Sequence, residues 1–149
     1  MADATAVLAY RDPKAALGWL QAAFGFEPQL LVSDSQDRVV FARLMLDGAS
    51  VGLAPEDEQM ASPLSAGRDT QMTGLRFAYG SIDLESHCAR AEGAGARIVR
   101  RPRQEFYGDL AYLCADPEGH LWEFSVRGGE PAPPPAGWAV RFPAQEPRP

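Results

Sequence analysis

The sequence predicts an α+β fold made of two βαβββ modules, and two repeated landmarks indicate it. Leu8-Ala9-Tyr10 recurs as Phe77-Ala78-Tyr79, a spacing of 77−8 = 69 residues. The turn Asp47-Gly48 recurs as Asp116-Pro117-Glu118-Gly119, and its aspartates are also 116−47 = 69 residues apart. The glycines are 119−48 = 71 apart because the second turn is two residues longer. Two unrelated landmarks at nearly one offset indicate a duplicated unit of about 70 residues.

The first half has the order β-α-β-β-β. A strand over 5–10 is followed by Asp12, which can cap a helix, and by Pro13, which fits the first turn. Apolar residues then recur at helical spacing up to Phe24, and Gly25 favours a helix end. Turn residues separate three predicted strands, and the Asp47-Gly48 turn is a strong hairpin signal. Those strands cover 27–33, 38–46 and 49–54.

The second half repeats this order after a predicted loop over 55–72. A helix is expected over 82–92, with Ser81 or Asp83 near its cap. The predicted strands cover 74–79, 97–100, 110–115 and 120–126. A loop over 103–109 carries Phe106 and Tyr107.

Residues 1–126 are predicted to form a single domain, with modules at 4–55 and 73–126. Residues 127–149 are rich in proline and form a predicted C-terminal tail. Trp138, Val140 and Phe142 alternate within this tail, so it either docks on a sheet edge or partner, or is a disordered end.

Composition excludes several classes of protein. The net charge is −6, with 14 basic against 20 acidic residues, which disfavours a nucleic-acid partner. No apolar run approaches the roughly 20 residues needed to cross a bilayer, and the first residues lack the features of a signal peptide. The two cysteines, Cys88 and Cys114, form no disulfide framework. We therefore expect a reduced, cytoplasmic protein.

The two βαβββ units, the Arg11-Asp12-Pro13 start and the segment Asp116-Pro117-Glu118-Gly119-His120-Leu121-Trp122-Glu123-Phe124 resemble the vicinal oxygen chelate superfamily. This is the family of glyoxalase I, bleomycin-resistance proteins, fosfomycin-resistance enzymes and extradiol dioxygenases. The resemblance covers about residues 4–126. It implies sheets that curl into a cleft, helices outside, and a homodimer.

The resemblance also implies four positions for metal ligands, on the first and last strand of each unit. They fall on Thr5, Gly52, a residue near Gly74, and Glu123. A divalent transition ion needs three or four His, Cys or carboxylate donors, and only Glu123 qualifies. His87 lies in a helix predicted to be outside the cleft, and alternation turns His120 away from Glu123. We therefore expect no metal and no other cofactor.

If Thr5 and Glu123 face inward, the period of two places small side chains in the cleft and bulky ones beneath the helices. The bulky set is Ala6, Leu8, Tyr10, Leu75, Phe77, Tyr79, Trp122 and Phe124. The candidate ligand-binding residues are Thr5, Val7, Gly52, Arg76, Tyr107, Leu113, Leu121 and Glu123.

Arg76 and Glu123 are expected to pair across neighbouring strands, either to orient a ligand or as a structural salt bridge. Tyr107 is either an aromatic lid or a packed anchor of its loop. Arg100, Arg101 and Arg103 either attract an anion or form solvated surface. No catalytic grouping is visible, and no residue is assigned a catalytic role.

Three functions remain open at this point. The first is metal-independent binding of a small apolar or aromatic molecule, as in bleomycin-resistance proteins. The second is an enzyme, a lyase, isomerase or oxygenase of the superfamily, with Glu123 as general base or with an atypical metal site that uses Glu105 or Asp109. The third is an interaction module that binds a partner through its Pro-rich tail.

Overall fold

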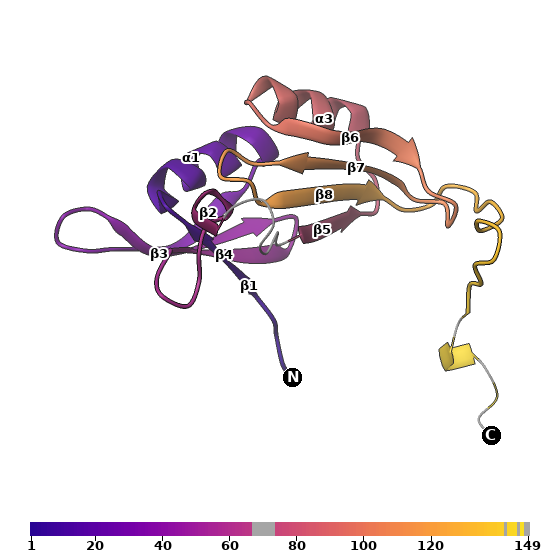
Figure 1. The fold of residues 1–149 in the computed structure, drawn as a ribbon, viewed down its shortest axis with the longest axis horizontal. Helices are drawn as coiled ribbons and strands as arrows, with labels where there is room; N and C mark the ends of the chain where they lie inside the picture. The colour runs from indigo at the N-terminus through magenta and orange to yellow at the C-terminus, as the bar shows by residue number, and fades with distance from the viewer. Residues whose placement is uncertain (67–73, 142, 146, 148–149) are drawn as a thin grey trace.

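The computed structural model of the chain describes residues 1–66, 74–141, 143–145 and 147. It contains two βαβββ modules, which confirms the predicted fold class (Figure 1). The first module comprises β1 (Ala6–Tyr10), α1 (Pro13–Phe24), β2 (Glu27–Ser33), β3 (Val39–Leu46) and β4 (Ala49–Pro55). The second comprises β5 (Gly74–Tyr79), α3 (Leu84–Gly93), β6 (Arg97–Gln104), β7 (Leu110–Ala115) and β8 (Leu121–Val126). A short helix, α2 (Pro63–Ala66), and a 3-10 helix, η1 (Pro143–Gln145), lie outside the modules.

Each module forms its own four-stranded mixed sheet with the same strand order. The orders are β1-β4-β3-β2 and β5-β8-β7-β6. The first strand of each module pairs in parallel with the last, and the remaining pairs are antiparallel. Equivalent strands therefore hold equivalent places, as expected of a duplication.

The helices cover one face of each sheet and contact each other. α1 packs on β1, β3 and β4, whereas α3 packs on β6, β7 and β8. The core lies between helices and sheets, and Leu8, Tyr10, Trp122 and Phe124 are buried there. The predicted alternation of bulky side chains beneath the helices is thus confirmed for these residues. Phe24 and Phe26 of the first module pack against Phe77, Trp122 and Phe124 of the second.

The ends of α1 follow from its flanking residues. The Asp12 carboxylate accepts a hydrogen bond from the Ala15 N–H at 3.0 Å, as expected of an N-cap. Gly25 ends the helix at φ +83°, a left-handed conformation that costs glycine little. Both features were predicted correctly.

A longer turn in the second module ties it to the start of α1 in the first. The Glu118 carboxylate accepts hydrogen bonds from the Arg11 N–H at 2.7 Å and the Asp12 N–H at 3.1 Å. In the same turn, Asp116 accepts hydrogen bonds from the Tyr10 hydroxyl at 2.6 Å and the Trp122 indole at 3.0 Å. The two residues that lengthen this turn therefore add a contact that the Asp47-Gly48 turn lacks.

Several predicted element bounds shift by one residue, and the structure differs from the prediction more clearly in β6, in the connecting loop and at the start of the second helix. β6 continues to Gln104, beyond the expected end at Arg100, because it is an edge strand with register shifts and can accommodate Pro102. The expected loop over 55–72 contains the single helical turn α2, where the Ser62 hydroxyl accepts from the Leu64 N–H. The second module's helix begins at Leu84 and not at residue 82, and Asp83, one of the two predicted cap residues, caps it.

The tail lies against the loop that precedes β7. The Ala132 N–H donates to the Phe106 carbonyl at 2.6 Å, and Trp138 meets the Phe106 ring edge-on at 6.1 Å between centroids. Trp138 thus contacts this loop, and Gln104 at the end of edge strand β6 donates a hydrogen bond to the Glu130 carbonyl of the tail at 3.2 Å. Phe142 and the part of the 55–72 loop beyond Ala66 lie outside the described residues. Within the described ranges, no helix has the length and hydropathy needed to span a membrane.

Candidate functional site

The candidate site is built on the sheet face that the helices leave open. In the second sheet, strand pairing places Arg76 beside Glu123, Glu123 beside Leu113, and Leu113 beside Arg100. These four residues form a row across β5, β8, β7 and β6. We call it the second-module row.

The first sheet carries an equivalent row, Val7, Gly52, Arg43 and Leu30, also joined by direct strand pairing. Its offsets from the second-module row are 76−7 = 69, 123−52 = 71, 113−43 = 70 and 100−30 = 70. The first row has one charged side chain and the second has three, so the duplicated positions have diverged in charge.

Glu123 lies at the centre of an ion-pair network. Its Oε1 accepts a hydrogen bond from Arg76 Nη1, and its Oε2 accepts one from Arg100 Nη2 at 3.2 Å. The predicted Arg76–Glu123 pair therefore forms. All three side chains are partly exposed, and such pairs typically stabilise a fold by about 1 kcal/mol or less.

The loop between β6 and β7 extends this network over Arg76. The Tyr107 hydroxyl accepts from Arg76 Nη1 at 2.9 Å, and Asp109 Oδ2 accepts from Nη2 at 3.0 Å. The Arg76 guanidinium carbon lies 5.5 Å from the centre of the Tyr107 ring. Since this ring is 43% exposed, it covers Arg76 while offering an aromatic surface to solvent.

Arg100 belongs to the site, although no sequence pattern distinguishes it from its basic neighbours Arg101 and Arg103. It reaches Glu123, and Glu105 Oε1 lies 3.8 Å from its Nη2. Arg101 instead pairs with Glu92 of α3, and Arg103 with Glu105. The alternation of β6 explains the division between Arg100 and Arg101, and that signal could have been used had the strand been predicted at its full length.

The first-module candidates lie on the other sheet. The Thr5 hydroxyl is 3.1 Å from the Ser50 hydroxyl, at a polar hollow of about 370 Å³ that Gln29 and Arg43 also line. Gly52 is not open to a guest: a Cβ placed there would lie 3.1 Å from Val7 Cγ2 and 3.3 Å from the Phe41 ring. Glycine at this position lets Val7 and Phe41 close over the strand.

The structure thus brings together four of the predicted residues: Arg76, Tyr107, Leu113 and Glu123. A fifth, Leu121, lies on the same sheet, where it pairs with Ala115 and Gly74. Val7 and Gly52 pair on the first sheet, and Thr5, which precedes β1, is hydrogen-bonded to Ser50 of β4, so these three form a separate group. Asp109 and Arg100 complete the second group, but neither was among the predicted ligand-binding residues.

The donor set does not suit a transition metal. Glu105, Asp109 and Glu123 are each engaged by arginine side chains. Among the residues that the structure describes, no three His, Cys, Asp or Glu side chains are grouped so as to hold a metal ion. His120 is buried and within 2.7 Å of the Ala9 carbonyl, so it serves the contact between the modules.

His87 lies beneath the second sheet, where its Nδ1 is hydrogen-bonded to the Tyr112 hydroxyl. Burial lowers the pKa of His87 to about 4, and the charge of Arg90 acts in the same direction. Protonation would place a hydrogen on both ring nitrogens, whereas Nε2 has no partner among the described residues.

We expect the protein to lose stability as pH falls from about 6.5 toward 4, because the unfolded chain takes up the His87 proton first. Above pH 6.5 the ring is neutral in both states, so the full stability is present there. Urea unfolding at pH 7.5, 5.5 and 4.5 measures this loss. His87→Gln cannot titrate and should show a shallower loss, and a variant with the wild-type slope would contradict this assignment.

A family model described as "Glyoxalase/Bleomycin resistance protein/Dioxygenase superfamily" matches residues 4–124. The chain belongs to this superfamily. The match includes both modules up to Phe124 of β8 and ends before the Pro-rich tail. The superfamily resemblance drawn from the sequence is therefore confirmed. No curated protein sequence matches the chain.

Solved structures of the superfamily's fold resemble the chain over most of its length. TioX from Micromonospora sp. ML1 is 29% identical, with a TM-score of 0.66 over 87% of this chain and 98% of that one. TnmS3, an antibiotic binding protein from Streptomyces sp. CB03234, is 20% identical, with a TM-score of 0.64 over 86% of this chain and 99% of that one. The fosfomycin resistance protein FosX from Listeria monocytogenes is 17% identical, with a TM-score of 0.61 over 86% of this chain and 94% of that one.

Proposed function

We propose that the protein is a metal-independent binder of a small aromatic or apolar molecule, held against the open face of the second sheet. The observation that carries the proposal is the state of Glu123, because both of its carboxylate oxygens are taken by arginines. The positive charges of these two guanidinium groups oppose the approach of a metal cation to the carboxylate. The similarity to an antibiotic binding protein supports the same reading.

The surroundings of Glu123 suit a flat ligand that carries a hydrogen-bond acceptor. Tyr107 offers an exposed aromatic surface, and Leu113 offers an apolar contact between Glu123 and Arg100. The guanidinium groups of Arg76 and Arg100 supply donors for an acceptor. An apolar surface with a few placed polar groups is the usual makeup of a ligand site.

We further propose that two copies of the chain complete the site. Several apolar side chains on or beside β2 are exposed, with Leu31 at 52%, Leu30 at 39%, Val32 at 41% and Val40 at 40%. A homodimer would cover such surface and could bring the first-module row of one copy near the second-module row of the other. Light scattering at micromolar protein should give a mass near 32 kDa, about twice the chain mass of 16.1 kDa. A mass of one chain under the same conditions would reject the dimer.

A thermal-shift screen of planar aromatic compounds tests the binding function. We expect a subset to raise the melting temperature in the presence of EDTA, because a ligand of the native state stabilises it without a metal. Leu113→Trp should abolish the shift by filling the contact surface. Elemental analysis of the purified protein should find no stoichiometric metal. One equivalent of zinc, nickel or iron, or silence across the library, would count against the proposal.

Glu123→Gln separates binding from catalysis. For a binder, we expect the affinity of a screened compound to fall by no more than about tenfold, since the shape of the side chain is kept, although the amide can accept from only one of the two arginines. The matched control is Glu92→Gln on α3, which removes the same charge from an ion pair with Arg101. This variant should leave the affinity for the compound unchanged.

The enzyme alternative keeps Glu123 as a general base next to Arg76. Under that alternative, Glu123→Gln would abolish turnover of a substrate while leaving its binding nearly intact. The residues between 1 and 126 are proposed as the functional domain in either case, with 127–149 as a tail that supports the Tyr107 loop.

A further inference from the structure

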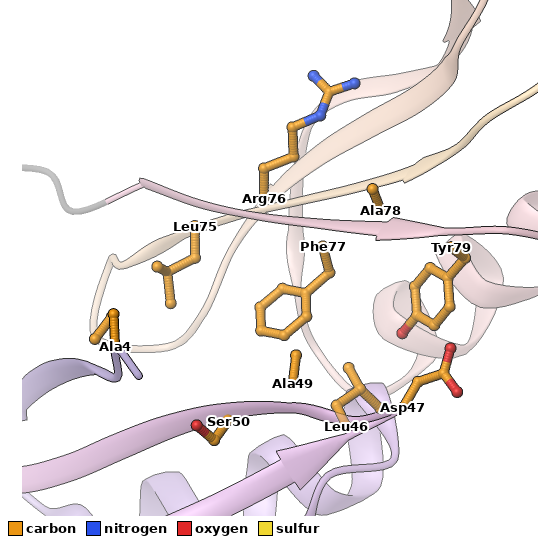
Figure 2. A pocket seen from close by; sticks show the side chains of 11 residues that line it. Ala4, Leu46, Asp47, Ala49, Ser50, Leu75, Arg76, Phe77, Ala78 and Tyr79 are labelled. Carbon is orange, nitrogen blue, oxygen red and sulfur yellow. The ribbon is translucent and has the colours of Figure 1, made fainter. Parts of the chain in front are cut away.

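A second hollow lies on the opposite side of β5 from the proposed binding face. It has a volume of about 390 Å³ and runs between β5 and the hairpin that joins β3 to β4. Figure 2 shows Leu75 and Phe77 pointing into it from β5, and Leu46 and Ala49 facing them from the hairpin. A hollow of this size falls in the range of small-molecule sites. We call it the hairpin groove.

One end of the hairpin groove is polar. There, Tyr79 and Asp47 point toward each other (Figure 2). The Tyr79 side chain is only 7% exposed. Burial and, to a smaller extent, the negative charge of Asp47 together raise the pKa of Tyr79 to about 12. The phenol therefore stays neutral and can accept a hydrogen bond.

The carboxylate of Asp47 has no partner within the described parts of the chain, where neither an ion pair nor a hydrogen bond reaches it. Arg76 of β5 also borders the groove, but its guanidinium points to the other face of the strand (Figure 2). There it forms ion pairs with Glu123 and Asp109. Among the described residues that line it, the hairpin groove thus combines an apolar body with one acidic side chain, Asp47, which is exposed and has no ion pair.

We propose that the hairpin groove binds an organic ammonium ion with an apolar or aromatic body. The ammonium group would lie between the Asp47 carboxylate and the Tyr79 hydroxyl, and the body would lie against Phe77, Leu75 and Leu46. The aromatic face of Phe77 favours a positive charge nearby. This site is separate from the one proposed for the second-module row.

Three compounds of matched shape and different charge test the proposal: 3-phenylpropylamine, 3-phenylpropanol and 3-phenylpropionate. Titration into ¹⁵N-labelled protein, followed by amide chemical shifts, gives affinity and location together. For the amine we expect saturable shifts at Leu46, Ala49 and Phe77, with a dissociation constant on the order of millimolar for so small a ligand. The alcohol and the carboxylate should bind at least about fivefold more weakly.

The decisive variant is Asp47→Asn. Asp47 has φ +48°, and asparagine tolerates this conformation, so the turn should be kept. We expect the variant to bind the amine and the alcohol with equal affinity. The matched control is Asp37→Asn, which removes the same charge from another turn residue with positive φ, at 60°. It should keep the wild-type preference for the amine.

Each result decides the matter. The proposal is overturned if the wild-type protein binds the three compounds with equal affinity, or if the amine preference survives Asp47→Asn. It is also overturned if the chemical-shift changes lie away from the groove, or if no change saturates. Glu123→Gln should leave amine binding unchanged, so failure of the binding function proposed above and failure of this site can be told apart.

Discussion

Asp116→Ala is expected to lower the free energy of unfolding by about 3 kcal/mol or more, because it leaves several buried donors without an acceptor. Asp116 is 6% exposed. Its Oδ2 accepts from the Tyr10 hydroxyl and the Trp122 indole, and its Oδ1 accepts from the N–H groups of Glu118 and His120 at 3.0 Å each. Urea unfolding followed by tryptophan fluorescence measures the loss.

Two further variants show whether the loss comes from the carboxylate or from one of its contacts. Tyr10→Phe removes a single donor and should cost about 1 kcal/mol. Asp116→Asn keeps one acceptor oxygen and should fall between the two. A loss below about 1 kcal/mol for Asp116→Ala would mean that water replaces the carboxylate, and the contact between the modules would then be weaker than its hydrogen bonds indicate.

Phe24→Ala is expected to cost about 3 to 5 kcal/mol, the usual range for truncating a fully packed aromatic side chain. Phe24 ends α1 and is 3% exposed. Its ring lies 4.7 Å from that of Phe124 and 5.4 Å from that of Trp122, measured between centroids. The cavity would open between the first module's helix and the second module's sheet, so the loss should appear in one cooperative transition.

Phe106→Ala is the control for this truncation. The Phe106 ring lies in the loop before β7, contacts Tyr107 and Trp138, and is only partly buried. We expect it to cost roughly 1 kcal/mol, in proportion to the smaller area it removes from water. If Phe24→Ala produced a separate early transition instead of a lower single one, the two modules would be shown to unfold independently.

The architecture could be predicted from the sequence because the duplication shows each helix and strand twice, so a pattern in one half can be checked against the other. The Asp-Gly turns, the Asp12 cap and the alternation of bulky residues such as Trp122 and Phe124 depend on local chemistry, and the structure confirms all of them. The pairing of Arg76 with Glu123 was also predictable, since it needs only the identity of two neighbouring strands.

The rest of the site depends on features that local patterns do not carry. Arg100 lies beside Leu113 and reaches Glu123 after a register shift between Ile98 and Arg100, which strand alternation alone does not predict. Asp109 accepts a hydrogen bond from Arg76 because of the path of the loop between β6 and β7, which local sequence patterns do not predict. The space above Gly52 is occupied by Phe41, a side chain from the neighbouring strand, so a small residue there does not imply a hollow.

The two additional residues in the second turn have a consequence for the stability of the first module on its own. Glu118, one of them, supplies the acceptors for the Arg11 and Asp12 N–H groups, where α1 begins more than a hundred positions earlier. Asp12 still caps α1 from within its own module, but the backbone donors just before that helix depend on an acceptor from the other half. We therefore expect a first-module fragment made alone to be less stable than the same module in the whole chain, and a second-module fragment added to it to restore part of the loss.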